Sequence, residues 1–319
     1  MKIKLKNIKN MNKSKTNKIN DTYNPYGVSS KMNIVLHILS FLFMVVCIAP
    51  VILVVMVSIT SEHSLTTYGY SFIPKEFSLI SYRFLLSDAE VILRAYGVTI
   101  TMTVVGTLVG VTIMALYAYP LSRNDFPFKK FFTVYIFFTM IFSGGLAPFY
   151  IVYTRYLNLR NTIIALILPS VFGVFNVFMV RTFFKSTIPQ SMIEAAKIDG
   201  ASELGIFWKI VIPLSKPVLA TIGLFTTIGY WNKYMHSLLF IDNEKLYSLQ
   251  FVMMRTMLQL QYLQSRVDAS PELRNMVNQI PNEGMRMAMV VLGMGPIILA
   301  YPWFQKYFVK GLTVGSIKG

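Results

Sequence analysis

The sequence predicts an all-α integral membrane protein with six transmembrane helices. Only 14% of the 319 residues are charged, whereas soluble domains usually carry about a quarter. The mean hydropathy is +0.54, and the charges gather in a few segments that separate six apolar stretches. Each stretch is long enough, at about 1.5 Å per helical residue, to cross a hydrocarbon layer about 30 Å thick.

The first span is predicted at residues 33–60, which contain no Asp, Glu, Lys or Arg. It exceeds the roughly 7–15 apolar residues of a secretory signal, and no small-residue cleavage site follows it, so we expect a retained helix. Gly106 and Gly110, in the second span, have the G-x-x-x-G spacing that lets helices approach closely, although small residues are common in membrane helices generally. The other five spans are predicted at residues 95–121, 131–153, 162–180, 217–241 and 287–304.

Basic residues set the expected orientation. Eight of the thirty Lys and Arg residues lie in a leader at residues 1–32, and others lie in the segment 181–216. This bias favours cytoplasmic termini, because Lys and Arg are enriched on the cytoplasmic side of membrane proteins. We expect a flexible leader that is attracted to anionic lipid, followed by a membrane domain at residues 33–319. No soluble, basic, folded surface is evident, so nucleic acid is not an expected partner.

Catalytic and metal-binding chemistry has little support in the sequence. Cys47 is the only cysteine, so neither an intramolecular disulfide nor a thiolate metal site is expected. The three histidines are scattered among spans and loops, and there is no glycine-flanked serine nucleophile or pair of intramembrane carboxylates. We therefore predict no catalytic, cofactor-binding or metal-binding residues in this chain.

The segment 181–216 predicts a helix–turn–helix on the cytoplasmic side. Thr187, followed three residues later by Gln190, has the spacing of a capping box, so a short helix is predicted to begin there. Gly200 is placed to end that helix with a positive φ. Ser202 is suited to cap a second short helix. Such an element fits docking onto another protein, and an amphipathic helix resting on lipid is the alternative.

The string E-A-A-K-I-D-G-A-S at residues 194–202 resembles the EAA loop of binding-protein-dependent ABC importer permeases. Ile212 stands where that family usually has Leu. The residues in register with the family pattern are Glu194, Ala195, Ala196, Gly200, Ile210 and Pro213. The tail at residues 305–319 resembles carbohydrate permeases of the maltose-importer type. L-Y-S-L-Q at residues 246–250 and F-S-G-G at residues 142–145 resemble a subgroup that imports complex oligosaccharides.

The resemblance implies a type I ABC importer permease in which residues 185–216 form a coupling loop. That loop would be seated on a cytoplasmic ATPase, whose ATP-driven closure switches a permease pair between inward- and outward-facing states. Its docking turn would contain Glu194, Ala195, Ala196, Asp199, Gly200 and Ala201, with Phe207, Ile210 and Pro213 as anchors to the bundle. The chain has no G-x-x-x-x-G-K-[ST] loop, so ATP and Mg are expected in separate ATPase subunits.

The resemblance also implies partners and a location. We expect a heterodimer with a second permease, two ATPase subunits and an extracellular solute-binding protein in a bacterial cytoplasmic membrane. The substrate would be a sugar or oligosaccharide. Residues 242–286 are predicted to form the extracellular loop on which the binding protein docks, and a surface loop without a particular role is the alternative.

The fourth and fifth spans contain candidates for a substrate pathway. Sugars are typically bound by aromatic faces and neutral amides, which selects Asn176, Tyr230, Trp231, Asn232 and Tyr234. Polar groups at membrane depth face either a cavity or a partner helix. The two asparagines are therefore equally consistent with hydrogen bonding between helices, and the aromatic residues with packing.

Two other transport functions stay open. A permease of a related ABC importer would carry another solute, such as an amino acid or phosphate. An ATP-independent carrier commonly needs acidic groups within the membrane, but none of the fourteen Asp and Glu residues falls inside the six predicted spans. A membrane scaffold without transport would leave the helix–turn–helix unexplained.

Overall fold

The computed structural model describes residues 30–265 and 281–315. Apart from one isolated β-bridge, the regular structure of these residues is helical, in agreement with the predicted fold class. The chain divides into two units, residues 1–53 and residues 54–319, which are described separately.

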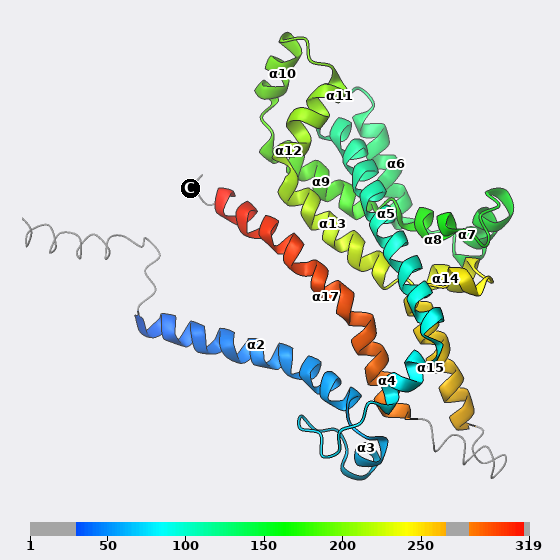
Figure 1. Cartoon of the computed structure of the whole chain (residues 1–319). Coiled ribbons are helices and arrows are strands. Elements are labelled where there is room, and N and C mark those ends of the chain that lie inside the picture. Colours follow the sequence, from blue (N-terminus) through cyan, green and yellow to red (C-terminus); the bar gives the residue numbers. More distant parts are fainter. Residues whose placement is uncertain (1–29, 266–280, 316–319) are drawn as a thin grey trace, which may run out of the picture. The chain divides into compact units, whose positions relative to one another are not determined.

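The first unit contains most of α2 (Ser30–Ser58; Figure 1). This helix is apolar on all sides and carries one charged side chain, Lys31, so it has the length and composition of a membrane span. Residues 33–58 of the first predicted span, residues 33–60, form one continuous helix. Of the predicted leader at residues 1–32, all but the last three residues lie outside the described part of the chain.

The second unit is organised around α5 (Ala89–Ser122), which contains the second predicted span. It packs against α13 (Lys216–Trp231) and α9 (Val174–Thr187). A Cβ at Gly106 would lie 2.4 Å from the ring of Tyr230 on α13, and a Cβ at Gly110 would lie 2.9 Å from the backbone oxygen of Val171, three residues before α9. The close approach predicted from their spacing is confirmed.

The third predicted span, residues 131–153, is not one uninterrupted helix. It is divided into α6 (Lys129–Ile141) and α7 (Leu146–Ile151), and a π-helical turn, η2 (Val152–Tyr156), continues α7. The two parts meet at a bend of 112°. Gly145, at the cap position before α7, has φ +86° and ψ 174°, a conformation that glycine adopts at little steric cost.

The fourth predicted span, residues 162–180, is also interrupted. α8 (Ile163–Ile167) runs into a single 3-10 turn, η3 (Leu168–Ser170), and α9 follows at a bend of 52°. Pro169 lies in the turn, where it lacks the backbone N–H that a continuing helix would use. The proline therefore separates two helices.

The fifth predicted span, residues 217–241, stops early. α13 ends at Trp231, and a short helix, α14 (Met235–Phe240), begins after a break. At the break the side-chain amide of Asn232 donates to the backbone oxygen of Ile228 at 3.0 Å. An asparagine that bonds to the local backbone competes with helix propagation.

The sixth predicted span, residues 287–304, lies inside the longer helix α17 (Asn282–Gly315). Within the described residues, three helices are long and apolar enough to cross a membrane alone, and the count reaches six if each of three bent pairs is one span. Six spans agree with the prediction. The predicted loop at residues 242–286 is not all loop, because α15 (Leu249–Ser265) occupies much of it. Residues 266–280 of that loop lie outside the described part of the chain.

The start of α17 is held by a carboxylate from another element. α3 (Glu62–Tyr68) presents Glu62, whose two oxygens accept from the backbone N–H groups of Glu283 and Gly284 at 3.1 and 3.2 Å. The first N–H groups of a helix have no partner within the helix, and a negative charge there also interacts favourably with the helix dipole. Glu62 therefore fixes the segment after α2 to the last helix.

Candidate coupling site

Three helices between α9 and α13 form the predicted helix–turn–helix, called the elbow below: α10 (Gln190–Ile198), α11 (Glu203–Ile206) and α12 (Ile212–Leu214). α10 and α11 lie together at one end of the second unit (Figure 1). A π-helical turn, η4 (Phe207–Val211), joins α11 to α12, so the second arm runs without a break through Pro213, as predicted.

The start of the elbow differs from the prediction. Thr187 is the last residue of α9 and does not cap the next helix, so the predicted capping box with Gln190 is wrong. Pro189 occupies the cap position of α10, with Ile188 extended before it at φ −98° and ψ 111°. A proline restricts the residue before it to extended conformations and has a φ suited to starting a helix. The chain is therefore divided by the proline rather than by a hydroxyl cap.

The turn between the two arms follows the prediction. Gly200 has φ +81°. Its N–H donates to the backbone oxygen of Lys197 at 3.0 Å, and the N–H of Ala201 donates to that of Ala196 at 2.9 Å. This pair of bonds is a Schellman motif, which satisfies the last carbonyls of α10. Ser202 then caps α11, since its Oγ accepts from the N–H of Gly205 at 3.1 Å.

The second arm anchors the elbow to the bundle. Phe207 is buried in an apolar cluster with side chains of α5 and α9, and its ring centroid lies 5.5 Å from that of Tyr119. Ile210 is half-buried against the same cluster. Pro213 is exposed, although it was expected to be an anchor with the other two. Its rigid ring shapes the chain at the junction with α13 rather than filling the core.

The first arm and the turn form an exposed surface. Of the predicted docking residues, Ala196 is half-buried and the other five are exposed: Glu194, Ala195, Asp199, Gly200 and Ala201. Ile198 is 86% exposed and Leu204 is 65% exposed. These two side chains were missed by the sequence analysis, although large apolar residues on a short polar helix were a usable signal. Ile198 and Leu204 therefore present apolar surface on either side of the turn.

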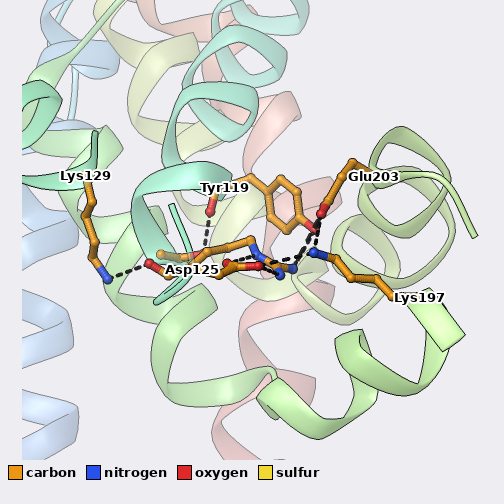
Figure 2. A network of polar contacts seen from close by, with 7 residues as sticks. Tyr119, Asp125, Lys129, Lys197 and Glu203 are labelled. Atoms are coloured by element: carbon orange, nitrogen blue, oxygen red, sulfur yellow. Dashed lines mark hydrogen bonds and ion pairs between the residues drawn. The ribbon is translucent and has the colours of Figure 1, made fainter. Parts of the chain in front are cut away.

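A network of polar contacts beside the elbow was also missed (Figure 2). At its centre is Arg123, just after α5, whose side chain is only 5% exposed. Its guanidinium donates from Nε to Oδ1 of Asp125 at 2.7 Å and from Nη2 to Oδ2 at 2.5 Å. Nη1 donates to the hydroxyl of Tyr119 at 3.2 Å. Paired donors of a planar guanidinium fix a carboxylate in both position and orientation.

Both arms of the elbow join this network. Lys197, on α10, places Nζ 2.6 Å from Oε1 of Glu203, on α11, and 3.2 Å from Oδ2 of Asp125. The hydroxyl of Tyr119 donates to Oε2 of Glu203 at 2.9 Å. Lys129, the first residue of α6, donates from Nζ to the backbone oxygen of Arg123 at 2.7 Å. Residues far apart in sequence from α5, α6, α10 and α11 are thus connected.

The contacts shift the pKa values of the network. Hydrogen bonds from Arg123 and then from Lys197 hold the pKa of the Asp125 carboxyl well below its usual range, and the bond to Asp125 raises the pKa of Arg123. Hydrogen bonds to Glu203 and Asp125 raise the pKa of Lys197. Burial opposes ionisation of Glu203, yet hydrogen bonds from Lys197 and Tyr119 leave its pKa lowered. Two positive and two negative groups are therefore ionised together near neutral pH.

The predicted pathway residues are not gathered in one place. Tyr230 and Trp231 are buried, and their polar atoms donate to the backbone oxygens of Ile167 at 2.7 Å and Gly293 at 2.8 Å. In this conformation both rings hold helices together. Asn176 is half-buried in the first turn of α9, whereas Asn232 and Tyr234 are exposed at the break between α13 and α14.

A cavity of about 530 Å³ lies between α5, α13 and α17. Its lining is mostly apolar and includes Thr103, Thr107 and Thr227. The hydroxyls of Thr107 and Thr227 are 3.2 Å apart, and Oγ1 of Thr103 is buried with no hydrogen-bond partner among the residues that the structure describes. The sequence analysis missed these threonines, although the four-residue spacing of two of them on α5 places both on one face.

Comparisons with known proteins agree with the fold. Residues 27–314 match the family described as binding-protein-dependent transport system inner membrane component. Protein LplC of Bacillus subtilis is 37% identical over 275 residues, which cover 86% of this chain and 90% of that protein. The polygalacturonan/rhamnogalacturonan transport system permease protein YtcP of the same bacterium is 36% identical over 278 residues, which cover 87% of this chain and 95% of that protein.

A solved structure has the same arrangement of helices. It is the crystal structure of a bacterial ABC transporter involved in the import of the acidic polysaccharide alginate. The matched chain is 30% identical, with a TM-score of 0.73 and coverage of 88% of this chain and 99% of that chain. Because the family match and these relatives span nearly the whole membrane region, this chain belongs to the family of inner-membrane permease components of binding-protein-dependent ABC importers.

Proposed function

We propose that this permease moves an oligosaccharide across a bacterial cytoplasmic membrane and that its elbow is driven by a separate ATPase subunit. The family to which the chain belongs comprises membrane components of importers that depend on a binding protein. The proposal adds the substrate class, the orientation and the docking surface. In it both termini lie in the cytoplasm, on the same side as the elbow, as the distribution of Lys and Arg favours.

The geometry of the elbow carries the proposal. α10 is a short helix that presents the 86%-exposed side chain of Ile198. The buried ring of Phe207 fixes the second arm to α5 and α9. A rigid, anchored helix with an exposed apolar tip suits a groove on a partner protein, because little conformational freedom is lost when it docks. The proposed docking turn comprises Glu194, Ala195, Ala196, Asp199, Gly200 and Ala201.

The partners follow from this reading. A second permease completes the pathway, two ATPase subunits bind ATP and Mg, and an extracellular binding protein delivers the substrate. In the proposal this chain hydrolyses no ATP itself, because its sequence has no phosphate-binding loop. Residues 242–286, with α15, are the proposed surface for the binding protein.

The substrate class is supported by what the relatives carry. One is named for the transport of polygalacturonan and rhamnogalacturonan, and another takes part in the import of alginate. These are polysaccharides rich in sugar acids, so we propose an oligosaccharide derived from a polymer of this kind. Asn176, Asn232 and Tyr234 are the proposed polar and aromatic contacts. In the described conformation Tyr230 and Trp231 pack between helices.

Co-purification tests the docking surface. The tagged chain is expressed with the second permease and the ATPase of its importer, and the ATPase that remains bound in detergent is measured for wild type, Gly200→Trp and Gly69→Trp. Both glycines have positive φ, +81° and +74°, and no atom of the described residues lies within 4 Å of a Cβ at either. We expect Gly200→Trp to lose the ATPase and Gly69→Trp to keep it. Failure of the wild type to bind an ATPase would refute the ATP-driven function.

Uptake into proteoliposomes tests the substrate. The assembled importer with its binding protein is supplied with oligogalacturonate, a neutral maltodextrin or an amino acid, with and without ATP inside. ATP-dependent uptake of oligogalacturonate supports the proposal, and uptake of the maltodextrin alone would shift it to neutral sugars. Uptake of the amino acid alone would reassign the permease to another solute. Uptake without ATP would favour an independent carrier.

A further inference from the structure

The network around Arg123 has no role in the proposed docking turn, because its central pair lies in the link between α5 and α6. We infer that Arg123 and Asp125 are positioning residues that make the elbow and α5 move as one rigid body. When an ATPase displaces the elbow, the angle between its two arms would then stay fixed, and the displacement would be passed to the transmembrane helices. The inference rests on the proposed docking of an ATPase on the elbow.

The network adds side-chain contacts across a turn that is otherwise held by backbone hydrogen bonds and the cap at Ser202. Gly200 separates the two arms, and no described atom lies within 4 Å of a Cβ at that position, so no side chain braces the turn there. Lys197 on one arm and Glu203 on the other form an ion pair across it at 2.6 Å. The Lys197 ammonium is also shared with Asp125 at 3.2 Å. The two arms are therefore bonded to each other and to the link after α5.

The central pair is not an ordinary surface contact. The guanidinium of Arg123 is nearly inaccessible, at 5% exposure, and it stays charged at any accessible pH. A buried charge that loses its partner is strongly unfavourable, so Arg123 holds Asp125 in one geometry through two hydrogen bonds. The ion pair of Arg94 with Glu90, along the outer part of α5, provides a contrast, because its arginine is 36% exposed and its carboxylate 84%. The corresponding values for Arg123 and Asp125 are 5% and 49%.

The network continues into two transmembrane helices. Tyr119, in the last turn of α5, donates to Glu203 and accepts from Arg123. Its ring also packs against Phe207 of the second arm. Lys129 connects the first residue of α6 to the backbone of Arg123. α5 is 34 residues long and runs from this end toward the other side of the membrane, so a tilt at its inner end moves its outer end as well.

Distances between spin labels test the rigid connection. The complete importer is reconstituted in nanodiscs with Cys47→Ser, and labels are attached through Ser191→Cys on α10 and Thr101→Cys on α5, two exposed positions. The distance distribution is measured without nucleotide and after trapping with ATP and orthovanadate. With the native network we expect one narrow peak that does not shift on trapping. With Asp125→Asn we expect that the distance distribution after trapping is no longer one narrow peak.

A second variant guards against a failure of assembly. Glu203→Gln weakens the ion pairs of this carboxylate with Lys197, at 2.6 Å, and with Arg123, at 3.9 Å. It is compared with Glu90→Gln, because both carboxylates lie in the first turn of a helix and Glu90 forms an ion pair outside the network, with Arg94. We expect Glu203→Gln to lose the single peak and Glu90→Gln to keep it. A residue that only stabilises the fold would lower the midpoint of thermal unfolding and leave the peak unchanged.

Three outcomes decide the inference. A peak that shifts in the native network on trapping would show that the elbow moves independently of α5 and would overturn it. A single unshifted peak in both Asp125→Asn and Glu203→Gln would also overturn it. Trapped ADP in the same sample would show that the ATPase had docked, so the proposed function would stand. If the wild-type chain retains no ATPase, the proposed function and this inference fall together.

Discussion

The ring of Tyr230 occupies the space in front of Gly106. A Cβ at position 106 would lie 2.4 Å from Cζ and 2.6 Å from Cε2 of that ring. The ring cannot withdraw easily, because Tyr230 is only 1% exposed and its hydroxyl donates to the backbone oxygen of Ile167 at 2.7 Å. The contact sets the separation between α5 and α13.

Gly106→Ala should therefore destabilise the protein by about 1–3 kcal/mol, as overpacking of a dense contact does. The matched control is Gly97→Ala on the same helix, where no described atom lies within 4 Å of the new Cβ. That change should be neutral or stabilising by up to about 1 kcal/mol, because alanine favours a helix more than glycine does. Thermal unfolding of both variants in detergent checks the difference, and equal midpoints would contradict the contact.

The docking surface predicts a second result. Ile198→Asp removes the exposed apolar tip of α10 without disturbing any buried side chain. We expect an unchanged unfolding midpoint and a loss of about 2 kcal/mol in ATPase binding, which is about thirty-fold in the dissociation constant. Titration of the solubilised permease pair with its ATPase measures this loss. Ile73→Asp, at a 79%-exposed position between α3 and α4, is the control that should bind normally.

The network predicts a dependence of stability on pH. Asp125 and Glu203 have pKa values below their ordinary ones of about 3.9 and 4.3. Their contribution to folding is therefore complete above those values and is lost as the pH falls through the lower values of the folded state. Lys197 has a raised pKa, so its contribution is complete below about 10.4 and is lost as the pH rises through its folded value.

We expect the unfolding midpoint to be level between about pH 6 and pH 9 and to fall below about pH 4. Asp125→Asn should lower the midpoint at neutral pH and reduce the fall in acid. Scans of thermal unfolding across this range, with Glu90→Gln as the control, measure both effects. An acid fall that is the same in Asp125→Asn and the wild type would show that this carboxylate does not stabilise the fold.

The start of α17 offers a fourth test. Glu62→Gln removes the negative charge that accepts from the N–H groups of Glu283 and Gly284. We expect a loss of about 1 kcal/mol, the usual scale of a helix cap. Hydrogen exchange at those two amides should speed up accordingly, while exchange within α5 stays unchanged. Unchanged exchange at both amides would mean that the carboxylate does not protect the helix end.

Local physical chemistry explains which parts of the fold the sequence predicted well. The six spans were found because an uncharged run of sufficient length has few alternatives to crossing a membrane. The turn at Gly200 and the cap at Ser202 were also correct, since each depends on the conformational freedom or the hydroxyl of a single residue. The predicted capping box at Thr187 failed because the adjacent Pro189 determined where the chain leaves α9.

The breaks within the spans were not predicted because apolar length does not report backbone direction. F-S-G-G at residues 142–145 indicated only a family resemblance, and only the structure gives the bend of 112° between α6 and α7 and the positive φ at Gly145. Likewise, the aromatic residues of the fifth span suited a sugar site as well as a helix contact. Tertiary packing placed Tyr230 against Gly106 and Trp231 against the backbone of α17.

The sequence by itself determined a membrane protein with six spans and an elbow between the fourth and fifth, because hydrophobic length, glycine and a hydroxyl cap act within a few residues of the chain. Only the tertiary structure decided that Arg123 and Asp125 lie beside Lys197 and Glu203. More than seventy residues separate those two groups, and a charge pair across such a distance exists only after the helices have packed. The residues that hold the elbow to α5 are therefore set by long-range contacts that no local pattern specifies.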